Sequence, residues 1–302
     1  MLGAPGRAAY LAYRAGADVA RVLPPTLGRS LARTASRALP VLWATRRRQV
    51  ERNLQRASRG QPGGPLEGDE LRRATRRVFD NYGRYWHELF RLRRGDDAIE
   101  ADTDSEGYQH IADPQAAGHG VILALPHLGN WDAAGAWLSG RGHRMTVVAE
   151  PLEPPELFEW FAAQRRALGM EVVPLGAGAA TAVLRALGEG QIAALVCDRD
   201  LAGDGVPVDL FGESTKMPGG PALLALRSGA PLVPVGIYFR PSSRRFINIL
   251  EPVPAERRGS LRDDVQRVTQ DLACRFEELI AAAPDQWLMM QPVWPVDMPN
   301  RS

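Results

Sequence analysis

The chain has 302 residues, 45% of them hydrophobic, which suits one large α/β domain or two small ones and argues against a disordered chain. Two cysteines, Cys197 and Cys274, are too few for a disulfide framework, so we expect buried free thiols in a reducing compartment. The net charge is only +2, yet the arginine-rich first 60 residues contain just two acidic residues, Asp18 and Glu51. Such a basic region attracts anionic lipid headgroups or nucleic acid.

The apolar segments of the chain are short. No run of about 18 uncharged apolar residues occurs, which argues against a transmembrane helix. Arg7 and Arg14 interrupt the apolar core that an amino-terminal signal peptide would need. We therefore expect a protein that stays on the cytosolic side, free or against a membrane.

The first part of the chain is predicted to be helical and amphipathic. Residues 7–22 place their apolar side chains near one stripe, namely Tyr10, Leu11, Ala15, Val19 and Val22. Pro24 should end this helix. A second basic helix is expected from about Leu27, broken near Pro40, and a third over residues 43–57. These helices could lie on a bilayer, or they could pack on the rest of the protein and expose their arginines.

Beyond a polar loop at residues 60–68 and a helix at 69–92, short apolar runs alternate with helical patterns. The runs cover residues 121–125, 145–149, 171–175, 192–197 and 232–239. Their continuous hydrophobicity is typical of strands covered on both faces, so we predict an α/β fold with a central, mainly parallel β-sheet flanked by helices. A last helix over 261–282 leads into a tryptophan-rich tail, which we expect to pack as a lid or core edge.

The segment LPHLGNWDAAGAW interrupts this apolar pattern with polar residues. Asn130 is a good N-cap for a helix over 131–139, so His127 should lie in the turn between strand and helix, where open α/β sheets bind ligands. Five residues on a straight helix would separate His127 from Asp132 by roughly 140°. A bend at Gly129 would let both side chains reach one cavity.

A histidine near a carboxylate is suited to act as a general base, because imidazole titrates near neutral pH and an acid fixes its tautomer. No Gly-x-Ser-x-Gly segment and no cysteine in a nucleophile setting occur, which favours direct transfer without a covalent intermediate. The histidine motif alone is weak evidence. Five histidines and two cysteines show no metal-ligand spacing, so no metal is expected.

Several ordered blocks of sequence give this motif its context. They are ALPHLGNWDAAGAWL at 124–138, VVAE at 147–150, RRALGMEVVPL at 165–175, DRDLAGDGVPVDLFGESTKMPGGPA at 198–222 and PDQWLMMQPVW at 284–294. Together they resemble the HtrB/LpxL-like lysophospholipid acyltransferases, and within that family most closely the actinobacterial phosphatidylinositol mannoside acyltransferases. The resemblance covers nearly the whole chain and implies a glycerolipid-acyltransferase-like fold.

The resemblance also implies roles for acidic residues around the histidine. His127 would be the catalytic base and Asp132 the acid of the HX4D motif. Mannoside-type members usually have a glutamate where this chain has Asp198, and that acid pairs with the histidine. Because aspartate is one methylene shorter, Asp132 or Asp200 are alternative partners. Alternatively, Asp132 only favours the helix dipole, while Asp198 and Asp200 only cap a strand end.

Further residues are implied in substrate binding. Arg165 would hold a phosphate or an oxyanion, with Glu150 orienting it through an ion pair; the alternative is a solvated helix arginine. Asp200 and Asp204 lie in the block at 198–222 that resembles the family. We assign them to substrate binding together with Arg165 and Glu150. The glycines at 218–221, at the start of an apolar helix, could bind a coenzyme A phosphate or only shape a turn.

The expected protein is a single acyltransferase domain over residues 1–302, with a basic helical region at 1–58 and a catalytic core at about 100–296. By resemblance it moves a long-chain acyl group, such as palmitoyl, from acyl-CoA to a mannose hydroxyl of a phosphatidylinositol mannoside, without a cofactor.

We expect peripheral attachment to anionic lipid at the cytoplasmic face of the plasma membrane, and no nucleic-acid partner. Lipid A acyltransferases generally carry an amino-terminal spanning helix, so the arginine-rich segment here favours the mannoside type. Alternatives are another glycolipid or lysophospholipid acceptor, a catalytically silent lipid-binding protein, and an esterase or thioesterase.

Overall fold

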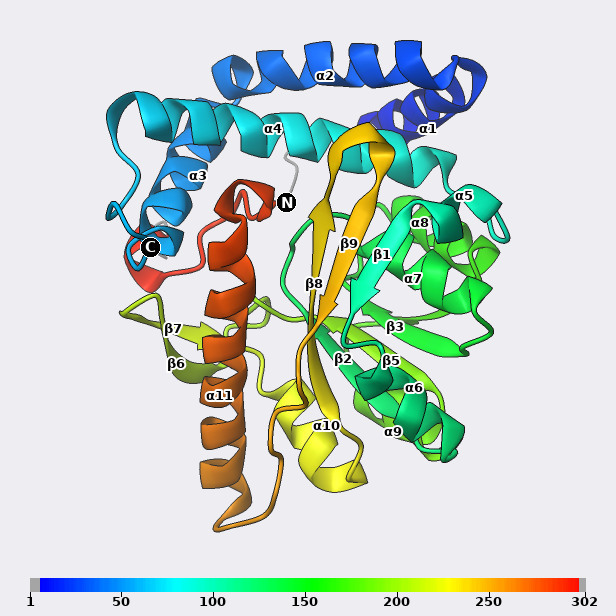
Figure 1. Cartoon of the computed structure of the whole chain (residues 1–302), viewed down its shortest axis with the longest axis vertical. Helices are drawn as coiled ribbons and strands as arrows, with labels where there is room; N and C mark the ends of the chain where they lie inside the picture. The colour runs from blue at the N-terminus through cyan, green and yellow to red at the C-terminus, as the bar shows by residue number, and fades with distance from the viewer. Residues whose placement is uncertain (1–5, 299–302) are drawn as a thin grey trace.

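The computed structural model describes residues 6–298 as an α/β fold, with helices on both faces of a sheet (Figure 1). The helices are α1 (Gly6–Val22), α2 (Pro25–Leu42), α3 (Ala44–Ala57), α4 (Gly68–Arg91), α5 (Asp97–Ala101), α6 (Gln109–Ala116), α7 (Trp131–Gly140), α8 (Pro155–Ala167), α9 (Ala179–Gly188), α10 (Gly220–Ser228) and α11 (Leu261–Ala282). The strands are β1 (Thr103–Glu106), β2 (Val121–Leu125), β3 (Met145–Ala149), β4 (Met170–Pro174), β5 (Ile192–Val196), β6 (Val206–Leu210), β7 (Glu213–Met217), β8 (Leu232–Phe239) and β9 (Arg245–Ile249).

Seven strands form the main sheet in the order β1-β9-β8-β2-β5-β3-β4. Every neighbouring pair is parallel except β8 and β9, which run antiparallel. The predicted α/β class with a mainly parallel sheet is therefore confirmed. The carboxyl end of β2, where His127 follows, lies in the middle of the sheet, flanked by β8 and β5.

Hydrophobic cores on both faces explain the apolar runs. Every residue of β2 and β8 is buried. One core joins the sheet to α9, α10, α11 and the tryptophan-rich tail, and the other joins it to α6 and α7. Alternate residues of β2 belong to opposite cores, since Ile122 and Ala124 face the first and Leu123 and Leu125 the second.

The amino-terminal helices pack on α4, which crosses over the end of the sheet near the start of α7 (Figure 1). Ala17 of α1 and Leu54 of α3 are buried, so these helices are part of the packed structure. The first and second helices nevertheless expose apolar side chains, among them Leu11, Val22, Leu27, Leu31, Val41 and Leu42. Within residues 6–298, no helix combines the length and hydropathy needed to cross a bilayer.

Some expected elements differ in the structure. Pro40 does not break the second helix, because it lies in the last turn of α2, which ends at Leu42. Four strands were missing from the prediction. The edge strand β1 is polar, β9 alternates buried and less buried residues, and β6 and β7 form a short separate hairpin beside α11. Their hydrophobic runs are too short or too polar to indicate a buried strand. Cys197 is buried as expected, but Cys274 is exposed on α11.

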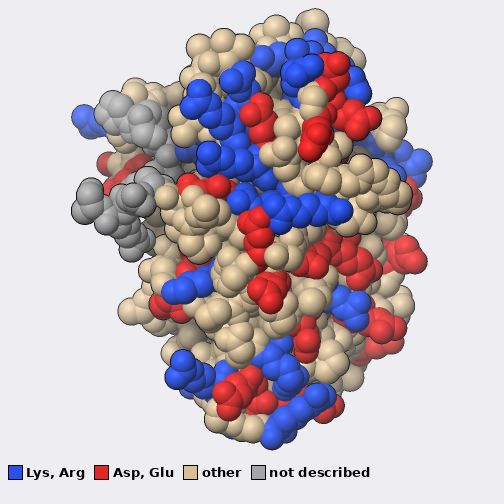
Figure 2. Space-filling view, turned by 90° about the vertical axis from the view of Figure 1, so that its left-hand side faces the viewer, with Lys and Arg blue, Asp and Glu red and all other residues tan. Residues whose placement is uncertain are grey.

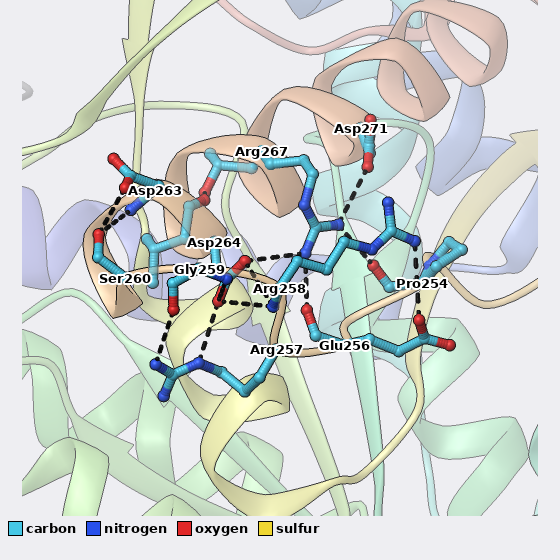
Figure 3. Close-up of polar contacts among 12 residues, drawn as sticks. Pro254, Glu256, Arg257, Arg258, Gly259, Ser260, Asp263, Asp264, Arg267 and Asp271 are labelled. Atoms are coloured by element: carbon cyan, nitrogen blue, oxygen red, sulfur yellow. Dashed lines mark hydrogen bonds and ion pairs between the residues drawn. The ribbon is translucent and has the colours of Figure 1, made fainter.

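A cluster of polar contacts fixes the start of α11 (Figure 3). Ser260 caps the helix by accepting a hydrogen bond from the backbone N–H of Asp263 at 3.2 Å. The carboxylate of Asp264 accepts hydrogen bonds from the backbone N–H of Arg258 and from Nε of Arg257, at 3.1 and 3.0 Å. Burial works to raise the pKa of Asp264, but these hydrogen bonds and a neighbouring arginine, Arg267, keep that pKa below its ordinary value.

We predict that Asp264→Asn lowers the melting temperature by a few degrees at neutral pH. A depressed pKa means that the stabilisation is present above the unfolded-state value of about 4 and is lost as the pH falls through the folded-state value. The difference between wild type and variant should therefore shrink near pH 3. Thermal unfolding followed by circular dichroism at both pH values measures it. Asp271→Asn, an exposed position on the same helix, is the control, and an equal effect of both substitutions would contradict the prediction.

Candidate active site

The turn between β2 and α7 carries His127 out of the sheet. Gly129 has φ of +64°, and a Cβ there would lie 2.1 Å from the carbonyl oxygen of Ile237, so only glycine fits this bend. Asn130 caps α7 as predicted, its side-chain oxygen accepting from the backbone N–H of Ala133 at 3.0 Å. The bend leaves the His127 side chain about one third exposed, while its neighbours in the turn are buried.

Asp198, two residues after the end of β5, is the acidic partner of His127. One carboxylate oxygen lies 2.6 Å from Nδ1 of His127, and the other accepts from the backbone N–H of His127 at 2.8 Å. The indole N–H of Trp287 donates to the same second oxygen at 2.7 Å. An aspartate at this position therefore reaches the histidine without the extra methylene of a glutamate.

Asp198 is fully buried, which by itself works to raise the pKa of its carboxyl group. The charge of His127 and the hydrogen bonds from His127 and Trp287 outweigh burial and hold the pKa below its ordinary value. The carboxylate is therefore ionised at neutral pH and can only accept hydrogen bonds. Nδ1 of His127 must carry a proton, which leaves Nε2 as the nitrogen able to take one up.

Asp132 does not hydrogen-bond to His127. Its buried carboxylate accepts from Arg165, with Nε at 2.6 Å and Nη2 at 3.2 Å, and from the hydroxyl of Tyr85 at 2.7 Å. Burial works to lower the pKa of Arg165, but the charge of Asp132 outweighs it and raises that pKa. The acid of the HX4D motif, Asp132, therefore pairs with an arginine and not with the histidine.

The expected ion pair between Glu150 and Arg165 is wrong. Arg165 forms an ion pair with Asp132, which lies in the first turn of α7. Glu150 instead lies 3.2 Å from Nη2 of Arg199. The guanidinium of Arg199 is largely buried, and its Nε has no hydrogen-bond partner among the described residues. Two arginines, each held by a separate acid, thus come from different elements of the fold, Arg165 from α8 (Pro155–Ala167) and Arg199 from the segment after β5.

Asp200 does not contact His127 either. Its two oxygens accept from the backbone N–H groups of Gly203 and Gly205 at 2.8 and 3.0 Å, so it shapes the loop before β6. Asp204 is exposed in that loop. The glycines at 218–221 do begin a helix, α10, but none of them lines the cavity at His127. Their assignment to a coenzyme A phosphate stays a prediction.

A cavity of about 230 Å³ opens beside His127 and runs between the sheet and α7. Its mouth is polar and is lined by His127, Asp132, Glu150, Arg165 and Arg199. Its deeper walls are apolar and come from β2, β3, β5, β8, β9 and α7. The bend at Gly129 thus brings His127 and Asp132 to one cavity, although they do not pair.

This arrangement is suited to remove a proton from a hydroxyl group and to accommodate an apolar chain next to it. The imidazole offers Nε2 as base, and Asp198 stabilises the charge that the ring acquires. The arginines at the mouth can stabilise an oxyanion or a phosphate. Within the described residues no cluster of three or more histidine, cysteine or acidic side chains is placed to hold a metal ion.

Three residues at this site were not predicted from the sequence to take part in it. Trp287 was expected only to pack, yet its indole N–H donates a hydrogen bond to Asp198. The need of a buried indole N–H for an acceptor could have indicated this contact. Tyr85 lies in the helix α4, far along the chain from Asp132, so spacing gives no hint of their contact. Arg199 follows Asp198 directly and could have been noticed as a charge at the end of a buried strand.

The chain is similar to known proteins over most of its length. The family model described as bacterial lipid A biosynthesis acyltransferase matches residues 2–295. A phosphatidylinositol mannoside acyltransferase of Mycobacterium tuberculosis (strain CDC 1551 / Oshkosh) is 39% identical over 293 residues, which cover 95% of this chain and 89% of that protein. A phosphatidylinositol mannoside acyltransferase of Mycolicibacterium smegmatis is 36% identical over 300 residues, covering 97% and 93%.

The family match extends over both the amino-terminal helices and the tail that carries Trp287. It confirms the family resemblance seen in the sequence blocks. The chain therefore belongs to the bacterial lipid A biosynthesis acyltransferase family.

Proposed function

We propose that this protein transfers a long-chain fatty acyl group, such as palmitoyl, from acyl-CoA to a mannose hydroxyl of a phosphatidylinositol mannoside. The observation that carries the proposal is the contact of 2.6 Å between His127 and the buried Asp198 at the mouth of an apolar cavity. The names of the mycobacterial relatives support the acceptor. The apolar walls of the cavity support a fatty acyl donor.

In the proposed reaction Nε2 of His127 takes the proton of the acceptor hydroxyl while its oxygen attacks the thioester carbonyl carbon. A tetrahedral intermediate forms, and Arg165 or Arg199 at the cavity mouth stabilises its oxyanion. The carbon–sulfur bond then breaks, and the imidazolium returns the proton to the coenzyme A thiolate. No acyl-enzyme is required, because the acceptor attacks directly.

We predict that His127→Gln lowers kcat for acyl transfer by about 10²–10⁴-fold, because the base is lost. Asp198→Asn should cost at least about a hundredfold, since the neutral amide cannot stabilise the imidazolium, whereas Asp198→Glu keeps the charge and should lose less. Mass spectrometry of products, with several acyl-CoA donors and phosphatidylinositol mono- and dimannosides as acceptors, measures the rates.

The control for the histidine is His119→Gln, an exposed histidine outside the cavity, which should retain wild-type rates. Lysophospholipid and other glycolipids are included as acceptors. Transfer to one of these but not to the mannosides would refute the proposed acceptor, and full activity of His127→Gln would refute the proposed base.

Asp132 and His127 should respond differently to substitution. Asp132→Asn leaves the charge of Arg165 without its buried partner, so we predict a loss of about 3 kcal/mol in the free energy of unfolding together with reduced activity. His127→Gln should reduce activity with a smaller loss of stability, because Asp198 keeps the hydrogen bonds from the indole of Trp287 and from the backbone N–H of residue 127. Denaturant unfolding and initial rates, measured on the same preparations, separate the two roles. Equal stability of the two variants would contradict this assignment.

The proposal includes peripheral attachment to the cytoplasmic face of the plasma membrane through α1 and α2. The exposed apolar side chains of these helices, for example Val22 at 84% exposure, lie among arginines such as Arg21 and Arg29. An apolar surface beside cationic groups is suited to an interface with anionic lipid. Figure 2 shows basic side chains gathered in the upper part of one face, where the amino-terminal helices lie in Figure 1.

We predict that the double substitution Val22→Glu and Leu27→Glu weakens binding to vesicles containing phosphatidylinositol on the order of tenfold, because two apolar side chains no longer enter the interface. Vesicle cosedimentation measures the binding. Val296→Glu, an exposed valine outside these helices, is the matched control. Point variants are preferred to deletion of residues 1–58, since α3 contributes Leu54 and Ala57 to the core. Unchanged binding of the double variant would exclude these helices as the membrane surface.

A further inference from the structure

We infer that Trp287 is a positioning residue that sets the pH range of the proposed transfer, because its indole N–H shares the buried carboxylate of Asp198 with His127. This inference rests on the proposed function, since it concerns the base of that reaction. It gives the tryptophan-rich tail (residues 284–294) a part in proton transfer, although no residue of the tail lines the cavity at His127.

The two oxygens of Asp198 serve different donors. Oδ1 lies 2.6 Å from Nδ1 of His127. Oδ2 accepts from the backbone N–H of His127 at 2.8 Å and from the indole N–H of Trp287 at 2.7 Å. The terminal torsion of an aspartate is broad without such contacts. Two donors on Oδ2 therefore hold the plane of the carboxylate and aim Oδ1 at the imidazole.

The backbone of the tail fixes Trp287 against the turn that carries His127. The N–H of Leu288 donates to the carbonyl oxygen of His127 at 2.7 Å. The N–H of Gly129 donates to the carbonyl oxygen of Gln286 at 3.0 Å. Trp287 lies between these two bonds, so its backbone has a fixed place relative to the turn.

The indole itself is enclosed. Trp287 is only 2% exposed, and its ring lies near those of Phe211 and Trp294, with centroid distances of 6.4 and 6.3 Å. The side chain of Gln286 exchanges two hydrogen bonds with the backbone of Phe239, at 2.6 and 3.2 Å, which ties the tail to the end of β8. The donor is therefore held in position by packing and by backbone contacts together.

The hydrogen bond from the indole changes how strongly the carboxylate attracts a proton. Burial works to raise the pKa of Asp198, while the charge of His127 and the hydrogen bonds from His127 and Trp287 hold that pKa below its ordinary value. Without the indole the carboxylate would be more basic and would stabilise the charged imidazolium more strongly. The ring would then stay protonated, and unable to act as a base, up to a higher pH.

The other charged side chains described around His127 do not depend on Trp287. Those that line the same cavity are Asp132 of α7, Glu150 after β3, Arg165 of α8 and Arg199 after β5. They form two ion pairs, Asp132 with Arg165 and Glu150 with Arg199. A substitution at position 287 leaves all four groups in place, so a change in pH dependence reports the contact with Asp198.

Trp287→Phe removes the indole donor and keeps an aromatic ring in the core. We expect the acidic limb of the kcat profile to move to higher pH by about one unit, so that the rate on this limb falls about tenfold. At alkaline pH, where the imidazole is neutral in both proteins, the rate should approach that of the wild type. KM should change little, because Trp287 does not line the cavity. Initial rates of acyl transfer from about pH 5 to pH 9 measure the shift.

Trp294→Phe is the matched control. Trp294 belongs to the same tail and is 1% exposed, yet its indole nitrogen has no hydrogen-bond partner within residues 6–298. This substitution removes a comparable amount of packing without touching the carboxylate. It should lower the melting temperature about as much as Trp287→Phe does, while the pH profile stays that of the wild type.

A tryptophan isostere at position 287 separates the N–H group from the shape of the ring. Benzothienylalanine has a sulfur atom in place of the indole N–H, so it keeps the packing that phenylalanine loses. Its site-specific incorporation should move the acidic limb as Trp287→Phe does, with a melting temperature close to that of the wild type. This variant tests the hydrogen bond even where Trp287→Phe folds poorly.

A second measurement does not depend on turnover. Nuclear magnetic resonance of the full chain with isotope-labelled histidine follows the protonation of His127 with pH, and His127→Gln identifies its signals. Both variants at position 287 should take up the second ring proton at higher pH than the wild type. Trp294→Phe should behave like the wild type.

These results separate the role of Trp287 from the proposed transfer. A rate loss that is uniform across the pH range, or an unchanged titration of His127 in both variants at position 287, would refute the inference. If no acyl-CoA supports transfer, the proposed function fails, and the titration of His127 alone decides the role of the indole. An upward shift in both measurements, absent in Trp294→Phe, supports it.

Discussion

A negative charge with no exposure to solvent is the constraint on which this candidate active site depends. Burying the Asp198 carboxylate is costly unless hydrogen bonds and an opposite charge compensate for the lost water. Compensation comes from two groups of His127 and from the indole of Trp287, which lie 71 and 89 residues away along the chain. The same three contacts fix the tautomer and the orientation of the imidazole. Stability of the centre and its readiness for proton transfer therefore have one origin.

The neighbouring charges are arranged by the same rule. Arg165 pairs with Asp132, and Arg199 pairs with Glu150, so each cation at the cavity mouth has an acid of its own. Asp198 then keeps His127 as its charged partner. This separation lets two positive groups line the same cavity as His127 without taking the histidine's acidic partner. The hydroxyl of Tyr85 donates a hydrogen bond to the buried Asp132, and this contact links α4 to the first turn of α7.

The sequence predicted the fold class and most of the buried elements. The runs that became β2, β3 and β8 have the expected boundaries because strands covered on both faces are continuously apolar. The strands β1 and β9 at the edge of the sheet lack such runs, so local hydrophobicity could not reveal them. Helix α2 continued past Pro40 because only its last turn was affected.

At the site, local geometry was predictable and pairing was not. The bend at Gly129 and the cap at Asn130 follow from residue types in a short segment. Which acid meets which base depends on contacts between distant segments, so the pairing of Glu150 with Arg199 had no local signal. Spacing within the HX4D motif brings both residues to one cavity without deciding their partners.

The position of Trp287 has a consequence for biogenesis. A chain made from its amino end produces His127 and Asp198 long before the indole that completes their surroundings. Until then the carboxylate has one donor too few, and water must take that place. The surroundings of Asp198 are thus complete only after the carboxy-terminal tail is made, although His127 emerges before the chain's midpoint.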